Sequence, residues 1–373
     1  MYDQIRGDTL YIMLYAVVTA IAVIACCYLL FRRANAIAPD ITPPLRLRRW
    51  TAAFFASFAL NHLWYMPILF HISNEDIVMI DLTGGLLDSV TLIPLAIIVL
   101  FVMLQDRQRS LWIVAVMMAP IVVGGAFSVV TCSYALQPIG YIYFLLICIG
   151  LIIYMVRALK QYGRWLRDNF ADLEHKEVWQ SFVFLGLIML VFVIYAFTGE
   201  GPVFQFAMQV IIVLLTCYLL WRVETLSDLG HGDEESRGQV NDSVQNQVPL
   251  DSSDLSLSIR NDIGPLLKKY CEDQQLYLQY DISISQLSQL IGINRSYLSK
   301  HFALQGITYN SYINGLRIQH FVNLYHEAVA THQPITAQQL AHQSGFRNYN
   351  TFSAAFKRNM GMNATEWMLL VKS

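Results

Sequence analysis

Two short segments near the C-terminus carry small polar and basic side chains at spacings of three, four and seven residues. In a helix, such spacings place the side chains on one face. Asparagine can bind the edge of adenine and lysine the edge of guanine, and cationic side chains also contact phosphates. The chemistry predicted here is therefore contact with a DNA duplex. The candidate residues are Arg295, Ser296, Ser299 and Lys300 in the first segment and Tyr349, Asn350, Ser353, Lys357 and Arg358 in the second.

The first segment, SISQLSQLIGINRSYLSKHF at residues 283–302, has the capping and turn residues of a helix-turn-helix. Ser283 followed by Gln286 predicts a capping box at the start of one helix. Gly292 is suited to a left-handed helix end, and Asn294 can cap the next helix. The second helix would then expose its polar face to a major groove.

The same design recurs about fifty residues later, with Thr336 and Gln339 as the cap and Gly345 at the turn. Arg347 precedes the second reading helix, which leaves Asn348 as the expected cap. A helix of roughly 18 residues, YNSYINGLRIQHFVNLYH, joins the two units and would span about 27 Å. Successive major-groove faces of a duplex are ~34 Å apart, so both units can contact one side of the DNA.

The rules of base readout divide the candidates into two groups. Asn350 suits adenine and Lys300 suits guanine. Arg295, Lys357 and Arg358 are expected to contact phosphates.

The last 110 or so residues resemble the DNA-binding domain of the AraC/XylS family. The resemblance includes GITYNSYINGLRI before the linker helix, GF followed by two phenylalanines four apart, and the closing KRNMGMNATEW. It implies double-stranded promoter DNA, a second copy of the chain and RNA polymerase as partners, and it favours activation of transcription. The family commonly has arginine where this chain has Ala354, so base selection is expected to depend more on the first unit.

The first 226 residues account for nearly all of an unusual apolar excess. The chain is 55% hydrophobic and 14% charged, which is too apolar for an ordinary soluble protein. A helix that crosses the hydrocarbon layer needs about 20 mostly apolar residues. Seven segments qualify, at residues 9–31, 50–71, 77–103, 111–131, 134–156, 180–198 and 203–222.

Lysine and arginine alternate between the connections of these segments. The first, third and fifth connections carry twelve of them, and the second, fourth and sixth carry none. Because cytoplasmic loops hold the basic excess, the N-terminus is expected outside and everything after Arg222 in the cytoplasm. The leader before the first segment contains Asp3 and Asp8, unlike the positive start of a signal peptide, so we expect this segment to remain.

The expected fold is therefore all-α and has three parts. Residues 1–226 form a polytopic seven-helix transmembrane bundle in the inner (cytoplasmic) membrane. Residues 227–258 form an acidic polar linker, with eight acids against one arginine between Glu224 and Ser258. Residues 259–373 form a cytoplasmic domain of two helix-turn-helix units joined by a linker helix.

Ionisable and amide side chains inside apolar segments are candidates for function because burying them in lipid is unfavourable. Asp81 and Asp88 lie seven residues apart on one helical face, and Asn61 and His62 belong to the preceding segment. Together they can line a pocket that responds to a cation, a polar ligand or pH. The alternative is that they serve helix packing and the headgroup region.

Catalysis is not expected. The sequence has no HExxH pair and no nucleotide-cradling glycine loop, and none of its six cysteines has the paired spacing of a zinc site. We therefore expect no metal and no cofactor. The prediction is a membrane-bound one-component transcriptional regulator that responds to a ligand or membrane partner, and the alternative is a membrane half that is a plain anchor or transporter-like module.

Overall fold

The computed structural model describes residues 8–70, 73–184, 186–187, 202–229, 263–332 and 336–372. Every regular element in these ranges is a helix, and Phe170 and Ser283 form an isolated antiparallel bridge. The all-α expectation is thus confirmed. The chain divides into two compact units, which are described separately. Unit 1 comprises Met1–Tyr162 and Val178–Leu229, and unit 2 comprises Gly163–Glu177 and Gly230–Ser373.

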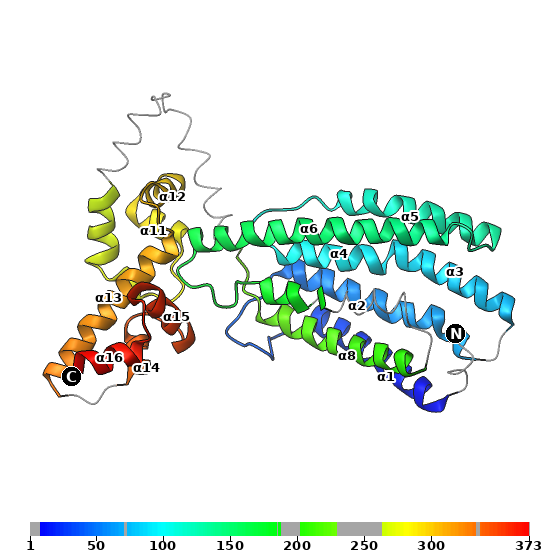
Figure 1. Ribbon diagram of the computed structural model, residues 1–373, viewed down its shortest axis with the longest axis horizontal. Coiled ribbons are helices and arrows are strands. Elements are labelled where there is room, and N and C mark those ends of the chain that lie inside the picture. Colours follow the sequence, from blue (N-terminus) through cyan, green and yellow to red (C-terminus); the bar gives the residue numbers. More distant parts are fainter. Residues whose placement is uncertain are drawn as a thin grey trace, which may run out of the picture. The chain divides into compact units, whose positions relative to one another are not determined.

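Unit 1 consists of long apolar helices (Figure 1). Among the described residues, six helical segments are long and apolar enough to cross a membrane, with α3 and α4 counted as one. The helices are α1 (Thr9–Phe31), α2 (Leu45–Tyr65) with the 3-10 turn η1 (Met66–Leu69), α3 (Asn74–Val90), α4 (Leu92–Met103), α5 (Trp112–Thr131), α6 (Gln137–Asn169) and α8 (Pro202–Thr225).

These six segments match six of the seven expected spans. Most of the seventh, at residues 180–198, lies outside the described residues, as does the expected linker from residue 230 onward. The largest difference from the expected boundaries is in α6, which continues past residue 156 to Asn169, and α2 begins at Leu45, five residues earlier than expected. This extension carries arginine and lysine side chains, which an apolar pattern alone does not assign to a spanning helix.

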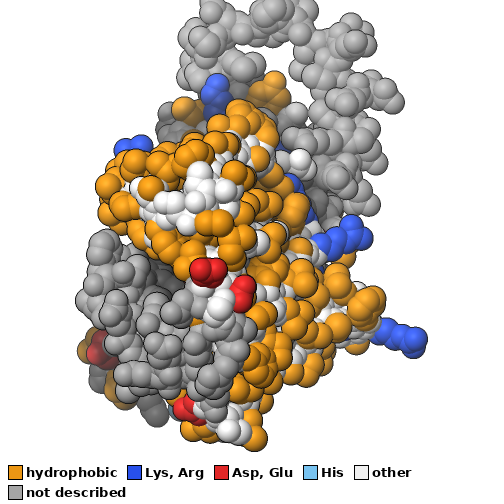
Figure 2. Space-filling view, turned by 90° about the vertical axis from the view of Figure 1, so that its right-hand side faces the viewer, with side chains coloured by type: hydrophobic (Ala, Val, Ile, Leu, Met, Phe, Trp, Pro, Cys, Tyr) orange, Lys and Arg blue, Asp and Glu red, His pale blue; other side chains and the backbone are white. Residues whose placement is uncertain are grey.

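Unit 1 buries part of its apolar surface between helices and leaves much of it exposed. Val18, Ala22, Phe58 and Ile212 form a small core between α1, α2 and α8. Other large side chains point outward, and Val130 is 83% exposed. In the space-filling view, hydrophobic side chains cover most of the described surface and charged ones are few (Figure 2). An apolar surface of this extent is typical of contact with lipid.

Unit 2 contains the end of α6, the loop after it and the C-terminal helices. Residues 263–267 are helical and lead into the π-helical turn η2 (Lys268–Glu272), followed by the 3-10 turn η3 (Leu276–Leu278). The remaining helices are α11 (Ile284–Ile291), α12 (Arg295–Leu304), α13 (Tyr309–Ala330), α14 (Ala337–Gln343), α15 (Tyr349–Met360) and α16 (Ala364–Lys372).

The long helix α13 contributes to two hydrophobic cores. Its first half packs with α11 and α12, where Leu287, Leu298 and Phe302 are buried. Its second half packs with α14, α15 and α16. Phe321 of α13 is at the centre of this second core, with its ring 4.6 Å from the ring of Phe352. Because both helix-turn-helix units pack against α13, this helix sets the distance between them.

Candidate nucleic-acid interface

The first helix-turn-helix unit is formed by α11 and α12. Ser283 and Gln286 make the expected capping box at the start of α11. Gly292 ends this helix with φ = 77°, a conformation that favours glycine. The Oδ1 atom of Asn294 accepts a hydrogen bond from the Ser296 amide at 2.8 Å. The sequence therefore fixes both the turn and the first residue of α12.

The second unit, α14 and α15, repeats this construction. Thr336 and Gln339 form a capping box, and Asn348 caps α15 by accepting from the amide of Thr351 at 2.8 Å. Gly345 has φ = 84°, and a Cβ atom there would lie 2.8 Å from the Cα of Leu278. Glycine is thus required at this turn both by its conformation and by the close approach of η3.

The candidate residues of the first unit lie on the outer side of α12. Ser296 and Lys300 are exposed, and Arg295 and Ser299 are half-buried. The inward side of the same helix holds the buried Leu298 and Phe302 of the first core. The helix therefore offers hydroxyl and ammonium groups to solvent in the way that a helix in a major groove would.

The candidate residues of the second unit lie on α15. Asn350, Lys357 and Arg358 are exposed, whereas Tyr349 and Ser353 are half-buried. The ring of Tyr349 is 5.5 Å from that of Phe352, which limits its freedom to reach a base.

The structure also identifies Arg317, which was not among the expected site residues. This side chain is 1% exposed in the middle of α13. It donates from Nε to the carbonyl of Tyr277 and from Nη2 to that of Gln279, both at 2.7 Å. Burial lowers the pKa of Arg317, and the charge of Asp172 opposes this shift. Its spacing of four from both Ile313 and Phe321, two inward-facing residues, was the sequence signal for a buried position.

The candidate sensing residues in unit 1 fall into three sets. The Nδ2 atom of Asn61 donates to Oδ1 of Asp88 at 2.7 Å, and the Tyr65 hydroxyl donates to Oδ2 at 3.2 Å. Asp81 instead accepts from the hydroxyl of Tyr134 at 3.1 Å. The structure therefore joins Asn61 to Asp88 but gives Asp81 a different partner.

His62 forms the third set and is 3% exposed. Its Nε2 atom is 3.2 Å from Oε1 of Gln209 in α8, and its Nδ1 atom is 3.2 Å from the carbonyl oxygen of Phe58. Gln209 also donates to the hydroxyl of Tyr11 at 3.4 Å. The imidazole thus belongs to a hydrogen-bonded connection between α2, α8 and α1.

A hollow of about 190 Å³ lies between α2 and α3, and one of its lining residues, Leu87, directly precedes Asp88 in the chain. Its lining is mostly apolar, and among the described residues no group of three or more His, Cys, Asp or Glu side chains is placed to hold a metal ion. The lining residues are Trp64, Met79, Ile80, Thr83, Gly84 and Leu87.

Comparisons with known proteins show a family match in the C-terminal part of the chain. Residues 287–369 match the family model of a helix-turn-helix domain. An uncharacterized HTH-type transcriptional regulator of Staphylococcus aureus strain MRSA252 is 32% identical over 101 residues, which are 27% of this chain and 13% of that protein. Proteins of the same description from strain COL and from another Staphylococcus aureus sequence are 31% and 34% identical over the same shares.

The chain thus spans only about an eighth of the length of these relatives. No solved structure gives a significant match. The similarity confirms a helix-turn-helix domain at the C-terminal end, of the kind present in proteins named as HTH-type transcriptional regulators.

Proposed function

We propose that this protein is a membrane-bound one-component transcriptional regulator. In this proposal, residues 259–373 bind promoter DNA in the cytoplasm, and residues 1–226 span the inner membrane and control that binding. The acidic segment 227–258 joins the two parts.

The observation that carries the proposal is the presence of two similar helix-turn-helix units. Both units combine a capping box, a left-handed glycine turn and a helix with an outward polar face. The family match at residues 287–369 covers the second unit and all of the first except its capping box. Two such units on one linker helix are typical of AraC/XylS-type domains, which the sequence also resembles. A lone unit would support the proposal much less, because single helix-turn-helix patterns occur in many proteins.

The membrane assignment is supported by the six apolar helices together with the alternation of basic residues between connections. With the expected seventh span at residues 180–198, the number of spans is odd. We therefore propose that the C-terminal part lies on the opposite side of the membrane from the N-terminus, in the cytoplasm. DNA is available to a membrane-bound reader only there.

Control by the membrane half is supported by the polar side chains within it. Asp88 has Asn61 and Tyr65 as partners, and it follows Leu87, one of the residues that line the hollow between α2 and α3. A ligand that prefers one packing of the helices would shift the population between two arrangements. We propose that this shift changes how two copies of the DNA-binding domain occupy one promoter, in contact with RNA polymerase.

The test is to recover the genomic fragments that the full-length protein binds in its own cells, and then to measure binding of the purified protein in lipid nanodiscs. The expected result is a short list of promoters and an affinity that falls steeply with salt, because phosphate contacts release counterions. The matched variants are Lys300→Ala, which should weaken binding, and Lys372→Ala at the end of α16, which should not.

A folded, membrane-inserted protein that retains no duplex at low salt would contradict the proposed function. If the protein binds promoters but substitutions in the membrane half leave transcription from these promoters unchanged, the result would instead favour the plain anchor. The hydrogen bonds of Asp88 support the plain-anchor alternative, because a carboxyl group whose two oxygens both have partners can serve helix packing alone.

A further inference from the structure

The loop that follows α6 pairs with the first helix-turn-helix unit inside unit 2. Phe170 lies opposite Ser283 in the antiparallel bridge. The amide of Ala171 donates to the carbonyl of Ile282 at 3.2 Å. The loop therefore adds a short strand-like segment to the residues that directly precede α11.

The carbonyl groups of the loop also have partners on this unit. The Nδ2 atom of Asn310, at the start of α13, donates to the carbonyl oxygen of Ala171 at 2.6 Å and to that of Phe170 at 3.3 Å. The side chain of Ala171 is fully buried in the first core. A loop that merely lay on the surface would not supply a core residue, so this contact is part of how the unit packs.

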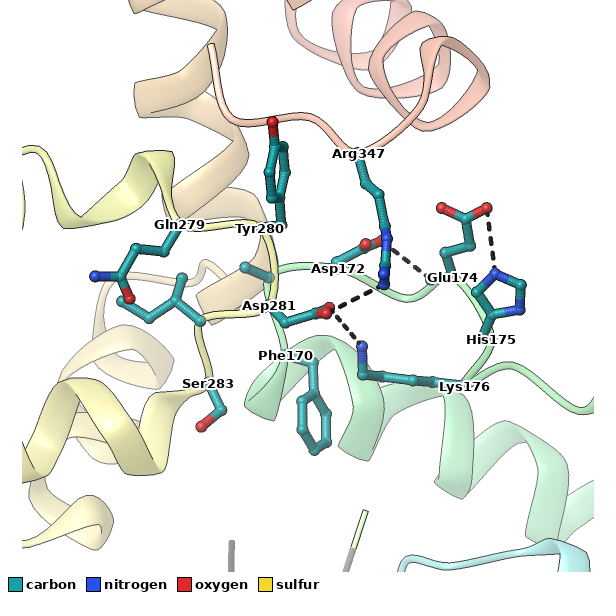
Figure 3. Close-up of polar contacts among 12 residues, drawn as sticks. Phe170, Asp172, Glu174, His175, Lys176, Gln279, Tyr280, Asp281, Ser283 and Arg347 are labelled. Carbon is teal, nitrogen blue, oxygen red and sulfur yellow. Dashed lines mark hydrogen bonds and ion pairs between the residues drawn. The ribbon is translucent and has the colours of Figure 1, made fainter. Parts of the chain in front are cut away.

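Charged side chains hold the other end of the loop (Figure 3). Asp281 accepts from Lys176 at 3.1 Å and from Arg347, at the turn of the second unit, at 3.3 Å. The carboxyl of Asp172 in the loop is buried, and its charge acts on Arg317. The loop thus contacts Asp281 and acts on Arg317 of the linker helix, and Asp281 in turn binds Arg347 at the second turn.

The last residue of α6, directly before this loop, contacts a candidate DNA-binding side chain. The Nη2 atom of Arg295 donates to Oδ1 of Asn169 at 2.5 Å. Arg295 begins α12 and is a predicted phosphate contact. Arginine binds phosphate most strongly through a fork of two parallel N–H groups, and Asn169 engages part of that fork.

We propose that the segment Asn169–Lys176 is an intramolecular partner of the first helix-turn-helix unit and competes with DNA for Arg295. The inference rests on the proposed DNA-binding function. The segment continues α6, whose earlier residues belong to unit 1, so a shift of α6 changes how firmly Asn169 holds Arg295. DNA binding and retention of the loop contact are then opposing states of one equilibrium.

Zero-length carbodiimide cross-linking of the full chain in nanodiscs tests the docked loop. An activated Asp281 carboxyl is expected to form an amide with Lys176, and mass spectrometry identifies the joined peptides. Lys176→Arg is the matched control, since it keeps the ion pair but forms no stable amide. Absence of the joined peptides from the wild-type protein, when other cross-links form, would overturn the docking.

Two substitutions at Asn169 test the competition in opposite directions. Both remove its hydrogen bond to the carbonyl of Trp165, so they differ mainly in their contact with Arg295. Asn169→Ala removes this hydrogen bond from the guanidinium, whereas Asn169→Asp offers it a carboxylate and holds it more strongly. With a 30-base-pair duplex of mixed sequence at low salt, we expect N169A to bind several-fold more tightly than the wild type and N169D more weakly.

The salt dependence separates this effect from a general loss of stability. If Arg295 gains a phosphate contact when the Asn169 bond is lost, the plot of log affinity against log salt should steepen by about one for N169A. The difference should vanish when Arg295→Ala is added. Equal slopes for N169A and N169D, in proteins that do bind the duplex, would overturn the competition alone. Loss of all duplex binding, including by wild type, would overturn the proposed function and the competition with it.

Discussion

The guanidinium of Arg317 lies 5.6 Å from the centre of the Phe346 ring, and both side chains are buried. Arg317 comes from the linker helix, and Phe346 fills the turn of the second helix-turn-helix unit. The same guanidinium donates to the carbonyl of Tyr277 in η3 and to that of Gln279 directly after it. One cation therefore holds the linker helix, the η3 segment and the second turn together.

Replacing Arg317 with lysine should destabilise unit 2 by about 2–3 kcal/mol, because an ammonium cannot serve two carbonyl groups and stack on a ring at once. The measurement is proteolysis of residues 263–372 during a urea titration of the membrane-inserted protein. Arg358→Lys, at an exposed site on α15, is the control and should change the midpoint little. Equal stability of the two variants would show that the contacts of Arg317 contribute little.

Gly345→Ala should destabilise unit 2 more than Gly292→Ala. Both glycines have positive φ, so each substitution strains the backbone by about 1 kcal/mol. Only at Gly345 does the new Cβ meet another backbone, that of Leu278, which should bring the loss to about 3 kcal/mol. Urea midpoints of the two variants, measured side by side, decide this. Similar midpoints would mean that η3 can move aside.

The thiol of Cys271 should be inert in the folded protein. Burial is the main cause that raises its pKa from 9.0 to about 12, and the side chain is fully buried. Iodoacetamide at pH 8 should therefore modify Cys271 only after unfolding, as peptide mass spectrometry can show. Because the folded state keeps a proton that the unfolded state releases, this group's contribution to stability is present below pH 9. It is lost as the pH rises towards about 12.

Two side chains on α15 should affect DNA binding in different ways. Lys357→Ala should weaken binding to all duplexes alike and reduce the salt slope by about one, as expected for a phosphate contact. Asn350→Ala should instead reduce the preference for adenine at one position, by about 1–3 kcal/mol. Binding to randomised duplexes, sequenced before and after selection, distinguishes the two. An unchanged base preference in the Asn350 variant would assign sequence selection to the first unit.

Asp88→Asn should change the output of target promoters without changing the amount of protein. The asparagine side chain has nearly the same size, but it lacks the negative carboxylate to which Asn61 and Tyr65 both donate hydrogen bonds. Thr91→Ser, which keeps a hydroxyl that donates to the Leu87 carbonyl on the same helix segment, is the matched control. Reporter activity and immunoblots of membranes give the two readouts. Identical output from both variants would favour a plain anchor.

The helix-turn-helix units could be predicted from sequence because their signals are local. Ser283 with Gln286, and Thr336 with Gln339, satisfy helix ends that lie within four residues of them. The turn at Gly345 was also expected, although the approach of Leu278 was not. Local hydrogen bonding and glycine's conformational freedom are properties of short segments, so they are visible without the fold.

The contacts of Asn169 and Asn310 could not be predicted in the same way. They join residues 126 to 140 positions apart through one or two hydrogen bonds, which leave no periodic pattern in either segment. The sequence also placed Asn61, His62, Asp81 and Asp88 in one candidate pocket. Helical spacing fixes which residues share a face, but the partner that each face meets depends on packing between helices, as with His62 and Gln209.

The fully buried Ala171 has a consequence for protein engineering. Unit 2, which contains both helix-turn-helix units, is discontinuous in sequence. Its first piece is Gly163–Glu177, and α8 lies between this piece and the rest of the unit in the chain. A chimera that grafts residues 263–373 onto a foreign receptor leaves the carbonyl of Ile282 and the amide of Asn310 without the loop. A transplant that also carries the 163–177 segment keeps these groups satisfied, so recombination between such genes is constrained at two places rather than one.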